Sequence, residues 1–300
     1  MTVPSSRLPL SRQQSKDPTQ SDPKNQSKST TVEKKMLSVK TSGTAAAISC
    51  SHFLSPRSFS PTALNLRHFK PHSSHRSIKM SAEQIVEHVV LFKAKPDADP
   101  SKLNAMINNL NSLTSLNQVV HLSSGPLIRD RSSSFSFTHI LHSRYKSKSD
   151  LADYSAHPSH VSVVKQYVLP MVDDIMAIDW VPTDFSGPSG VPPGSAMRVT
   201  FLKLKENLGE NEKSQVLSAV GGIIEKFPGI QQLTVGENFS PGRAKGFSIA
   251  SIAVFKGVEN LEALESQTEL ANEQKEKVKD FLDGVVVVDY AVLPTQSASL

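Results

Sequence analysis

Two short apolar runs decide the fold: residues 88–95 read HVVLFKAK, and residues 198–205 read RVTFLKLK. Both runs are rich in β-branched and other apolar residues, which predicts a β-strand for each. They align at an offset of 110 residues, which places Val199 on Val89. The same offset pairs Phe137 with Phe247, Leu151 with Leu261, Lys165 with Lys275 and Asp179 with Asp289. A near-constant offset over a whole unit predicts a duplicated domain.

The first unit, residues 83–182, has the pattern β-α-β-β-α-α-β. Its predicted strands are residues 88–95, 119–125, 135–145 and 175–182, and its predicted helices are residues 101–116, 149–154 and 159–171. Ser101 and Ser149 are the expected helix caps, and residues 129–134 are expected to form a polar loop. A linker rich in Pro, Gly and Ser follows at residues 183–195. The second unit, residues 196–293, repeats the pattern with helices at about 210–226 and 260–282 and a last strand at 285–292.

This order predicts an α+β fold of tandem ferredoxin-like units, each with an antiparallel sheet and helices on one face. The strand sequences VVLFK and VVVVDYA are apolar on both sides, so the free sheet face must also be covered. Pairing of the two units of one chain into a dimeric-type α+β barrel is the simplest solution. Pairing of two chains is the alternative, and a higher oligomer remains open. The barrel interior is expected to form a ligand pocket.

The chain outside these units has a different composition. Residues 1–79 contain 13 Lys and Arg against three acidic residues, whereas the rest contains 20 against 25, so the basic character belongs to a leader that we expect to be disordered. We therefore expect no nucleic-acid partner for the folded part. The only cysteine, Cys50, lies in the leader, and no apolar run is long enough for a membrane span.

Two targeting signals compete. Residues 36–79 are rich in Ser and lack acidic residues, as in a chloroplast transit peptide, although an unaddressed disordered tail is the alternative. The tail at residues 294–300 ends in Ala-Ser-Leu, a variant of the peroxisomal signal. Translation can start at Met1, Met36 or Met80, and a start at Met80 removes the first signal and keeps the second.

The stretch DLADYSAHPSHVSVV at residues 150–164 contains the most specific chemistry. Tyr154, His157 and His160 follow one another at a spacing of three, so a tight break at Pro158 can turn all three toward one cavity. A histidine can accept an acidic proton near neutral pH, and a phenol can donate a hydrogen bond to an enolate oxygen. The alternative is a helix junction in which Pro158 begins the second helix and a neighbouring histidine caps it.

The succession of HVVLFK, FTHI, DY-x-x-HP-x-HV and a final strand ending in DW-x-P resembles the stress-responsive dimeric α+β barrel family, or Dabb family. The resemblance covers about residues 83–292 and extends distantly to the polyketide cyclase olivetolic acid cyclase. It implies Tyr154 and His160 as the acid–base pair, and His88, His139 and His157 as ligand-binding residues. For His139, a satisfied core histidine is the alternative. No cofactor is required, although some relatives bind Mg²⁺ through backbone carbonyls at positions that match Asn111, Thr114 and Asn117.

Unit two departs from this pattern, because Leu264, Gln267 and Leu270 stand where unit one has Tyr154, His157 and His160. Arg198 and Ile249 likewise replace His88 and His139. One potential site per chain follows. The resulting prediction is a stress-response barrel protein that binds a small apolar or polyketide-like molecule in the barrel. A cyclase-like enzyme that uses Tyr154 and His160 is one alternative, and a non-catalytic defence or interaction protein is the other.

Overall fold

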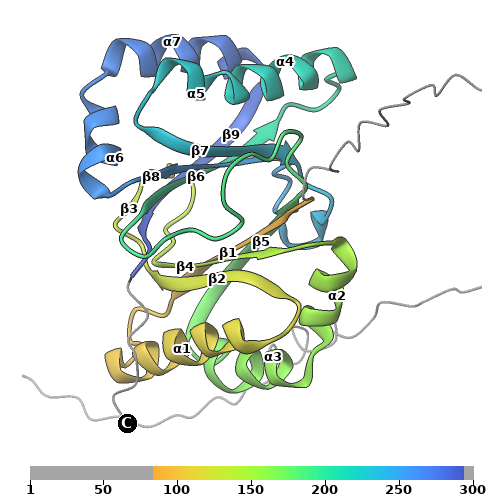
Figure 1. The fold of residues 1–300 in the computed structure, drawn as a ribbon, viewed down its shortest axis with the longest axis vertical. Helices are drawn as coiled ribbons and strands as arrows, with labels where there is room; N and C mark the ends of the chain where they lie inside the picture. Colours follow the sequence, from red (N-terminus) through yellow and green to blue (C-terminus); the bar gives the residue numbers. More distant parts are fainter. Residues whose placement is uncertain (1–83, 294–300) are drawn as a thin grey trace, which may run out of the picture. The chain divides into compact units, whose positions relative to one another are not determined.

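The computed structural model describes residues 84–293, in which two α+β units follow one another (Figure 1). The predictions for the leader and for the C-terminal tripeptide lie outside these residues. Among residues 84–293, no helix combines the length and the apolar character that crossing a membrane requires.

Unit one contains the predicted order with a short additional strand. Its strands are β1 (Val86–Ala94), β2 (Val119–Pro126), β3 (Arg129–Asp130), β4 (His139–Tyr145) and β5 (Val172–Trp180). Its helices are α1 (Pro100–Ser112), α2 (Lys148–Ala156) and α3 (Pro158–Val163), with a 3-10 turn at Leu113–Ser115 and a π-helical turn at Val164–Val168. The main sheet has the strand order β2-β4-β1-β5, and all its neighbours are antiparallel.

Unit two repeats this arrangement. Its strands are β6 (Ala196–Leu204), β7 (Ile230–Glu237), β8 (Ile249–Phe255) and β9 (Leu282–Ala291). Its helices are α4 (Glu210–Gly221), α5 (Ile223–Lys226), α6 (Val258–Glu265) and α7 (Thr268–Val278), and 3-10 turns lie at Pro241–Arg243 and Lys279–Phe281. The sheet order is β3-β9-β6-β8-β7, so the short strand β3 of unit one forms the edge of the unit-two sheet.

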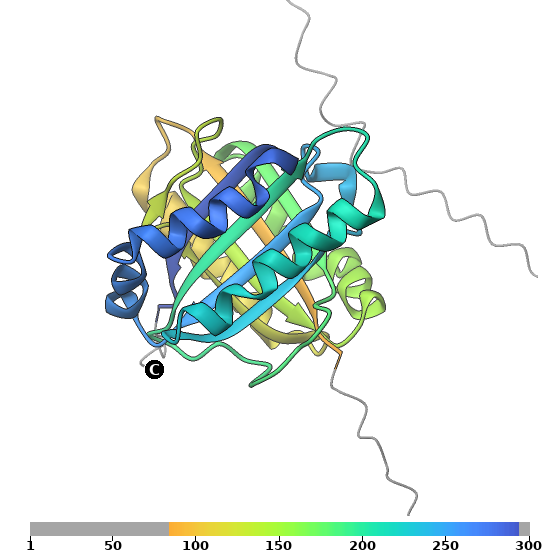
Figure 2. The ribbon, with the colours of Figure 1, turned by 90° about the horizontal axis from the view of Figure 1, so that it is seen from above.

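The two sheets face each other, and their edges meet (Figures 1 and 2). On one side β3 pairs with β9, and on the other side Trp180 at the end of β5 forms an isolated bridge with Asn238 after β7. The helices cover the outer faces of the sheets. The predicted pairing of two units within one chain is therefore the arrangement in the structure, and tandem ferredoxin-like units are confirmed as the fold.

The barrel interior is an apolar core to which both units contribute. Val89 and Leu91 of β1 and Val199 and Phe201 of β6 belong to one cluster of buried side chains. Alternate residues of the same strands point outward, so Val86 and Phe92 pack in a separate core against the helices of unit one. The expectation of a ligand pocket inside the barrel is not met, because the side chains of the two sheets fill that space.

Several predicted boundaries differ from those in the structure, and local hydrogen bonds explain the differences. Asp99 rather than Ser101 caps α1, and Ser147 rather than Ser149 caps α2. The third long strand begins at His139 instead of Phe135, because the Asp130 carboxylate accepts hydrogen bonds from the backbone N–H groups of residues 132 and 137 and holds the preceding segment as a loop. In unit two, the predicted helix 210–226 breaks at Gly222, and the predicted helix 260–282 breaks at residues 266–267.

Candidate functional site

The predicted site residues lie on the outer face of the unit-one sheet, beneath α2 and α3, and not in the barrel. His88 lies on the same face of β1 as Val86 and Phe92, because alternate residues of a strand share a face, and Val86 and Phe92 pack toward the helices. Tyr154 on α2 is 1% exposed and belongs to the same core. Alternation along the strand therefore separates the candidate site from the barrel interior.

A histidine–carboxylate pair forms the base of the site. His88 Nδ1 donates to Asp179 Oδ1 at 2.5 Å, and the two residues are directly opposite each other in the β1–β5 pairing. Burial by itself would raise the pKa of Asp179, but His88, a hydrogen bond from Ser240 and the charge of Arg243 lower it below its ordinary value. Asp179 is therefore ionised near neutral pH. The hydrogen bond to Asp179 fixes the orientation of the His88 ring.

Two phenols and a second imidazole lie above this pair. The Tyr145 ring is 6.3 Å from the His88 ring and 5.2 Å from the Tyr154 ring, and the Tyr154 ring is 4.6 Å from the His160 ring. The Tyr145 hydroxyl shares a hydrogen bond of 2.9 Å with Ser143 Oγ. The Tyr154 hydroxyl is buried and makes no hydrogen bond of good geometry within residues 84–293. Its nearest hydroxyl neighbour in the cluster is that of Tyr145, which partly offsets the effect of burial on the pKa of Tyr154.

The protonation states give the two predicted catalytic residues different roles. Burial raises the pKa of Tyr154, and the neighbouring Tyr145 hydroxyl offsets only part of this rise, so Tyr154 stays a phenol and can donate a proton or a hydrogen bond. Burial also lowers the pKa of His160, which keeps its imidazole neutral. His160 Nδ1 donates to the backbone carbonyl of Ser155 at 3.0 Å, so Nε2 is the basic atom. A donor and a base therefore lie side by side.

His157 and His139 have other surroundings. His157 caps α3, since its Nδ1 accepts from the backbone N–H of Ser159 at 3.2 Å, which is the role that the helix-junction alternative predicts. His139 is paired with Phe92, four residues along β1 from His88, or roughly 13 Å at the usual rise of a strand. Its Nδ1 lies 2.8 Å from Thr138 Oγ1. The structure thus brings His88, Tyr154 and His160 together and leaves His139 apart.

Sequence reasoning missed two members of this cluster. Asp179 is visible in the sequence as part of the repeat, but its role depends on the β1–β5 register that places it opposite His88. Tyr145 comes from the end of β4 and reaches the site through its pairing with β1. The signal that could have found both is strand alternation, which places them on the face that His88 occupies.

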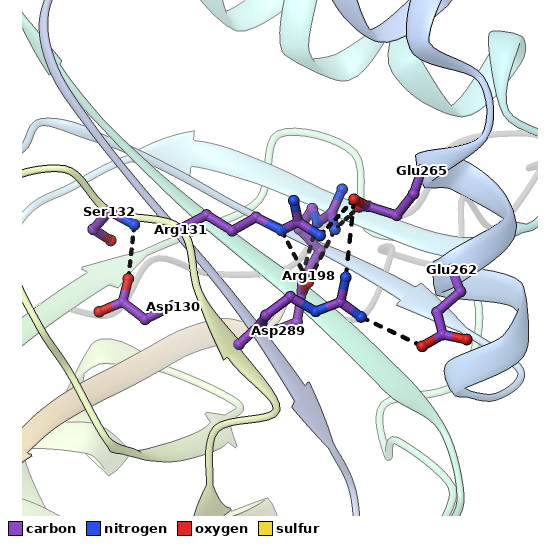
Figure 3. A network of polar contacts seen from close by, with 8 residues as sticks. Asp130, Arg131, Ser132, Arg198, Glu262, Glu265 and Asp289 are labelled. Carbon is purple, nitrogen blue, oxygen red and sulfur yellow. Dashed lines mark hydrogen bonds and ion pairs between the residues drawn. The ribbon is translucent and has the colours of Figure 1, made fainter. Parts of the chain in front are cut away.

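Unit two has an ion-pair network in place of this cluster (Figure 3). Arg198 and Asp289 have the same register as His88 and Asp179, and Arg198 donates to both oxygens of Asp289 at 2.8 and 3.0 Å. Arg198 also donates to Glu265. A guanidinium remains charged at all ordinary pH values, so this position cannot take up or release a proton.

The positions with which the resemblance associates Mg²⁺ lie where α1 ends. Asn111 exchanges two hydrogen bonds with the backbone of Ser124, at 2.8 and 3.1 Å, and Thr114 Oγ1 donates to the carbonyl of Leu122 at 3.3 Å. The Asn111 carbonyl accepts from the backbone of Leu113. These contacts join α1 to β2, and the binding of Mg²⁺ by the backbone carbonyls of Asn111, Thr114 and Asn117 stays a prediction. In residues 84–293, no three His, Cys, Asp or Glu side chains are grouped as metal ligands.

A second polar cluster lies inside one end of the barrel, and no sequence pattern indicated it. Arg144 pairs with Glu87 at 2.9 Å, His142 donates to Glu87 at 2.7 Å, and all three side chains are fully buried. Arg144 also donates to Gln232 of unit two at 2.8 Å and to the carbonyls of the linker residues Pro188 and Ser189. This cluster connects both units and the linker.

An open pocket of about 350 Å³ lies where the two units meet, next to the candidate site. Its lining residues are Lys148, Val181, Thr183, Leu217, Glu237, Asn238 and Phe239. Val181 and Phe239 also pack against the core that contains Tyr145 and Tyr154, and the backbone N–H of Phe239 donates to the carbonyl of Asp179 at 2.9 Å. The pocket therefore borders the core that contains Tyr145 and Tyr154, although His88, Tyr145, Tyr154 and His160 do not line it.

Fold, repeat and site agree with one protein family. The model of the stress responsive A/B barrel domain matches residues 86–182 and again residues 197–292. The chain belongs to this family and carries the domain twice in tandem.

Among known proteins, a stress-response A/B barrel domain-containing protein of Arabidopsis thaliana is 56% identical over 216 residues, which are 72% of this chain and 81% of that protein. A second protein of this kind from the same plant, DABB1, is 46% identical over 210 residues, or 69% of this chain and 97% of that protein. A solved structure from Fusobacterium nucleatum superposes with a TM-score of 0.50 at 14% identity, covering 72% of this chain and 94% of that one. That likeness supports the fold alone.

Proposed function

We propose that this stress-response A/B barrel protein binds a small, largely apolar carbonyl compound, polyketide-like in character, beneath α2 and α3 of unit one, and moves a proton on it. The observation that carries the proposal is the buried Tyr154 hydroxyl, which lies beside the Tyr145 hydroxyl without a hydrogen bond of good geometry within the described residues, and whose ring lies 4.6 Å from the His160 ring. An unpaired buried hydroxyl costs stability, so its retention favours a role toward a ligand.

The chemistry follows from the protonation states. A carbonyl oxygen accepts a hydrogen bond from Tyr154, and the neutral Nε2 of His160 removes a proton from the carbon next to that carbonyl. His88, oriented by Asp179, lies on the sheet side of the same cluster. The enolate that forms is stabilised by the phenol, and the proton returns to carbon or to an oxygen of the ligand. Apolar side chains of the same core, Leu141, Leu151 and Val163 among them, favour an apolar ligand.

The open pocket at the junction of the units offers a route to this site. Phe239 lies between the pocket and the core around Tyr154, and Lys148 Nζ lies 4.1 Å from the centre of its ring. We infer that a ligand enters past Phe239, so that unit two contributes to access although it supplies no acid–base residue.

An isotope-exchange assay tests the proposal without knowledge of the natural ligand. The probe is an alkyl-substituted β-keto ester in D₂O, and NMR follows the loss of the proton between its carbonyls. We expect the protein to accelerate exchange, and Tyr154→Phe and His160→Gln to reduce that acceleration by about 100-fold. His139→Gln is the matched control, because His139 lies apart from the cluster, and it should leave the rate unchanged. Exchange at the buffer rate, or an equal loss in His139→Gln, would contradict the proposal.

A non-catalytic role as an interaction or defence protein is the second candidate. The observation that favours it is the packed barrel, together with the 1% exposure of Tyr154. Under this alternative the probe neither exchanges faster nor raises the melting temperature, and Tyr154→Phe behaves as a core substitution only.

A further inference from the structure

We propose that the acidic surface of unit two selects a unit one, and not a second unit two, as its barrel partner, by binding a basic arm that unit one extends onto it. The arm is residues 128–131, and the acidic surface consists of Glu262, Glu265 and Asp289. This inference concerns the choice of partner and does not depend on the proposed ligand chemistry.

The backbone of the arm adds a strand to the unit-two sheet. Arg129 and Asp130 pair with Asp289 and Val288, the backbone N–H of Ile128 donates to the carbonyl of Asp289 at 2.8 Å, and that of Arg131 donates to the carbonyl of Val287 at 2.9 Å. Backbone pairing of this kind accepts almost any sequence, so it gives affinity without selectivity. The side chains must therefore supply the selectivity.

The side chains of the arm make ion pairs with the acidic surface (Figure 3). Arg131 donates to Glu265 at 2.5 Å and to Asp289 at 3.3 Å, and Arg129 donates to Glu262 at 3.4 Å. The Asp289 side chain is fully buried, and those of Arg131 and Glu265 are about one-third exposed, at 33% and 29%. Burial by itself would raise the pKa of Glu265, but Arg198 and Arg131 lower it, so the carboxylate stays charged.

Unit one does not offer the same acidic surface to a second copy of its own arm. At the offset of 110 residues, Ala152 and Ser155 stand where unit two has Glu262 and Glu265. The remaining carboxylate, Asp179, is already hydrogen-bonded to His88. A barrel made of two copies of unit one would leave both arginine residues of each arm without these partners.

Unit two has a weaker counterpart of this arm. Its backbone pairing places Phe239 where the arm has Ile128, so Ser240 and Gly242 stand at the positions of Arg129 and Arg131. The segment has a single arginine near unit one, Arg243, which together with a hydrogen bond from Ser240 lowers the pKa of Asp179. It attaches to unit one through the backbone, since the N–H of Phe239 donates to the carbonyl of Asp179 at 2.9 Å. A barrel made of two copies of unit two would offer Ser240, Gly242 and the single Arg243 to Glu262, Glu265 and Asp289, in place of the two arginines of the arm. Charge complementarity thus favours the mixed pair.

The pairing rule fixes the number of acid–base clusters in a barrel. Unit one carries His88, Tyr154 and His160, and the corresponding face of unit two carries the network around Arg198. A barrel of unit one and unit two contains one acid–base cluster. A barrel of two copies of unit one would contain two, and a barrel of two copies of unit two would contain none. The ion pairs that replaced the cluster in unit two therefore act as its pairing surface.

Charge reversal in the full chain tests this proposal. We expect the arm reversal Arg129→Glu/Arg131→Glu to lower the melting temperature by about 5 °C or more, because it leaves partly buried carboxylates facing like charges. Lys226→Glu is the matched control: Lys226 pairs with Glu273 at 2.6 Å within unit two, on an exposed surface, and its reversal should shift the melting temperature by about 1 °C. Arg129→Glu should also be rescued by Glu262→Arg in the same chain.

Partner choice is read by native mass spectrometry on a mixture. One chain carries the arm reversal, and the other carries Glu262→Arg/Glu265→Arg. Within each chain, the arm and the acidic surface then carry charges of the same sign. The arm of either chain is, however, complementary to unit two of the other chain. The fraction of one-to-one dimer in the mixture should therefore be at least tenfold higher than the dimer fraction of either chain measured separately. Failure of the Glu262→Arg rescue, or equal dimer levels in the mixture and in the separate chains, would overturn the proposal, and the rescue remains informative if the double reversals do not fold.

Discussion

At the scale of single residues, Tyr154 and Tyr145 offer a matched comparison between a hydroxyl that stabilises the fold and one that does not. The Tyr145 hydroxyl is hydrogen-bonded to Ser143, whereas that of Tyr154 is buried without a partner within the described residues. We expect Tyr154→Phe to keep or raise the free energy of unfolding, by up to about 1 kcal/mol, and Tyr145→Phe to lower it by about 1 kcal/mol.

Urea denaturation of both variants measures this difference. A loss of stability in Tyr154→Phe as large as that in Tyr145→Phe would mean that the Tyr154 hydroxyl has a structural partner, and would remove the argument that it is kept for a ligand.

Residue identity alone could predict part of this site. The spacing of Tyr154, His157 and His160 predicted that their side chains gather, and the rings of Tyr154 and His160 lie 4.6 Å apart. His157 could not be separated from them by spacing, because whether it faces the ligand or caps α3 depends on the backbone at Pro158. Asp179 could not be recognised as the partner of His88, because the two are 91 residues apart and meet only through the strand register.

At the scale of elements, the close approach of β5 and β7 depends on a glycine. A Cβ atom on Gly236 would lie 2.6 Å from the carbonyl oxygen of Val181 and 2.7 Å from Cδ1 of Trp180. The matched position in unit one is Gly125, where a Cβ atom would lie 3.1 Å from Tyr290 Cε2. We expect Gly236→Ala to lower the free energy of unfolding by about 3 kcal/mol and Gly125→Ala by about 1 kcal/mol, since a backbone atom yields less than a ring edge.

Thermal and urea unfolding of the two variants check this expectation. Equal losses of the free energy of unfolding at both glycines would contradict it. They would show that the contact between β5 and β7 contributes no more to stability than the contact of Gly125 with Tyr290.

Element existence was more predictable than element ends. Alternation and helical periodicity depend on many residues at once, so the long strands and the first helix of each unit could be predicted from the sequence. The strand β3 could not, because its two residues are polar and pair with β9, some 160 residues away, in the other unit. The breaks at Gly222 and at residues 266–267 reflect local caps that periodicity does not register.

At the scale of the whole molecule, the duplication allowed the barrel to be predicted from the sequence. It did not allow us to predict whether side chains fill the barrel interior. Apolar strands on both faces required a second sheet, and a second unit in the same chain supplied it. Whether the enclosed space is a pocket or a core depends on the size and rotamers of the side chains that meet there, such as Phe201 and Met176. The network of Glu87, His142 and Arg144 likewise requires three residues of two strands to meet in three dimensions.

That network makes the joining of the two units sensitive to acid. His121 on β2 lies beside this network, with its ring 5.2 Å from the His142 ring. Burial, together with the charges of His142 and Arg144, lowers the pKa of His121 to about 3, from an ordinary value of 6.5. Burial alone would raise the pKa of Glu87, but Arg144 and His142 lower it from 4.5 to about 2. Both folded-state values are depressed, so in both cases the unfolded chain binds the proton more readily, and stability is lost as the pH falls.

The loss should occur in two successive pH ranges. His121 contributes from pH 6.5 downward, at up to about 1.4 kcal/mol per pH unit, and Glu87 adds a loss on the order of 3 kcal/mol between pH 4.5 and 2. His121→Gln is the matched variant, because Gln232 occupies the corresponding place in the β7–β8 pairing of unit two. It should reduce the loss of free energy of unfolding between pH 6.5 and 4.5, leaving the part that His142 contributes because burial also lowers its pKa, and it should leave the lower range in place.

Urea denaturation at a series of pH values measures both ranges, and limited proteolysis of the linker in parallel reports whether the units separate. Because Arg144 binds Gln232 and the carbonyls of Pro188 and Ser189, protonation of Glu87 should release the linker and the contact between units together. If His121→Gln shows the same slope as the natural protein above pH 4.5, His121 is not buried in its neutral form. If the linker becomes cleavable only after both units have unfolded, the network stabilises each unit without joining them.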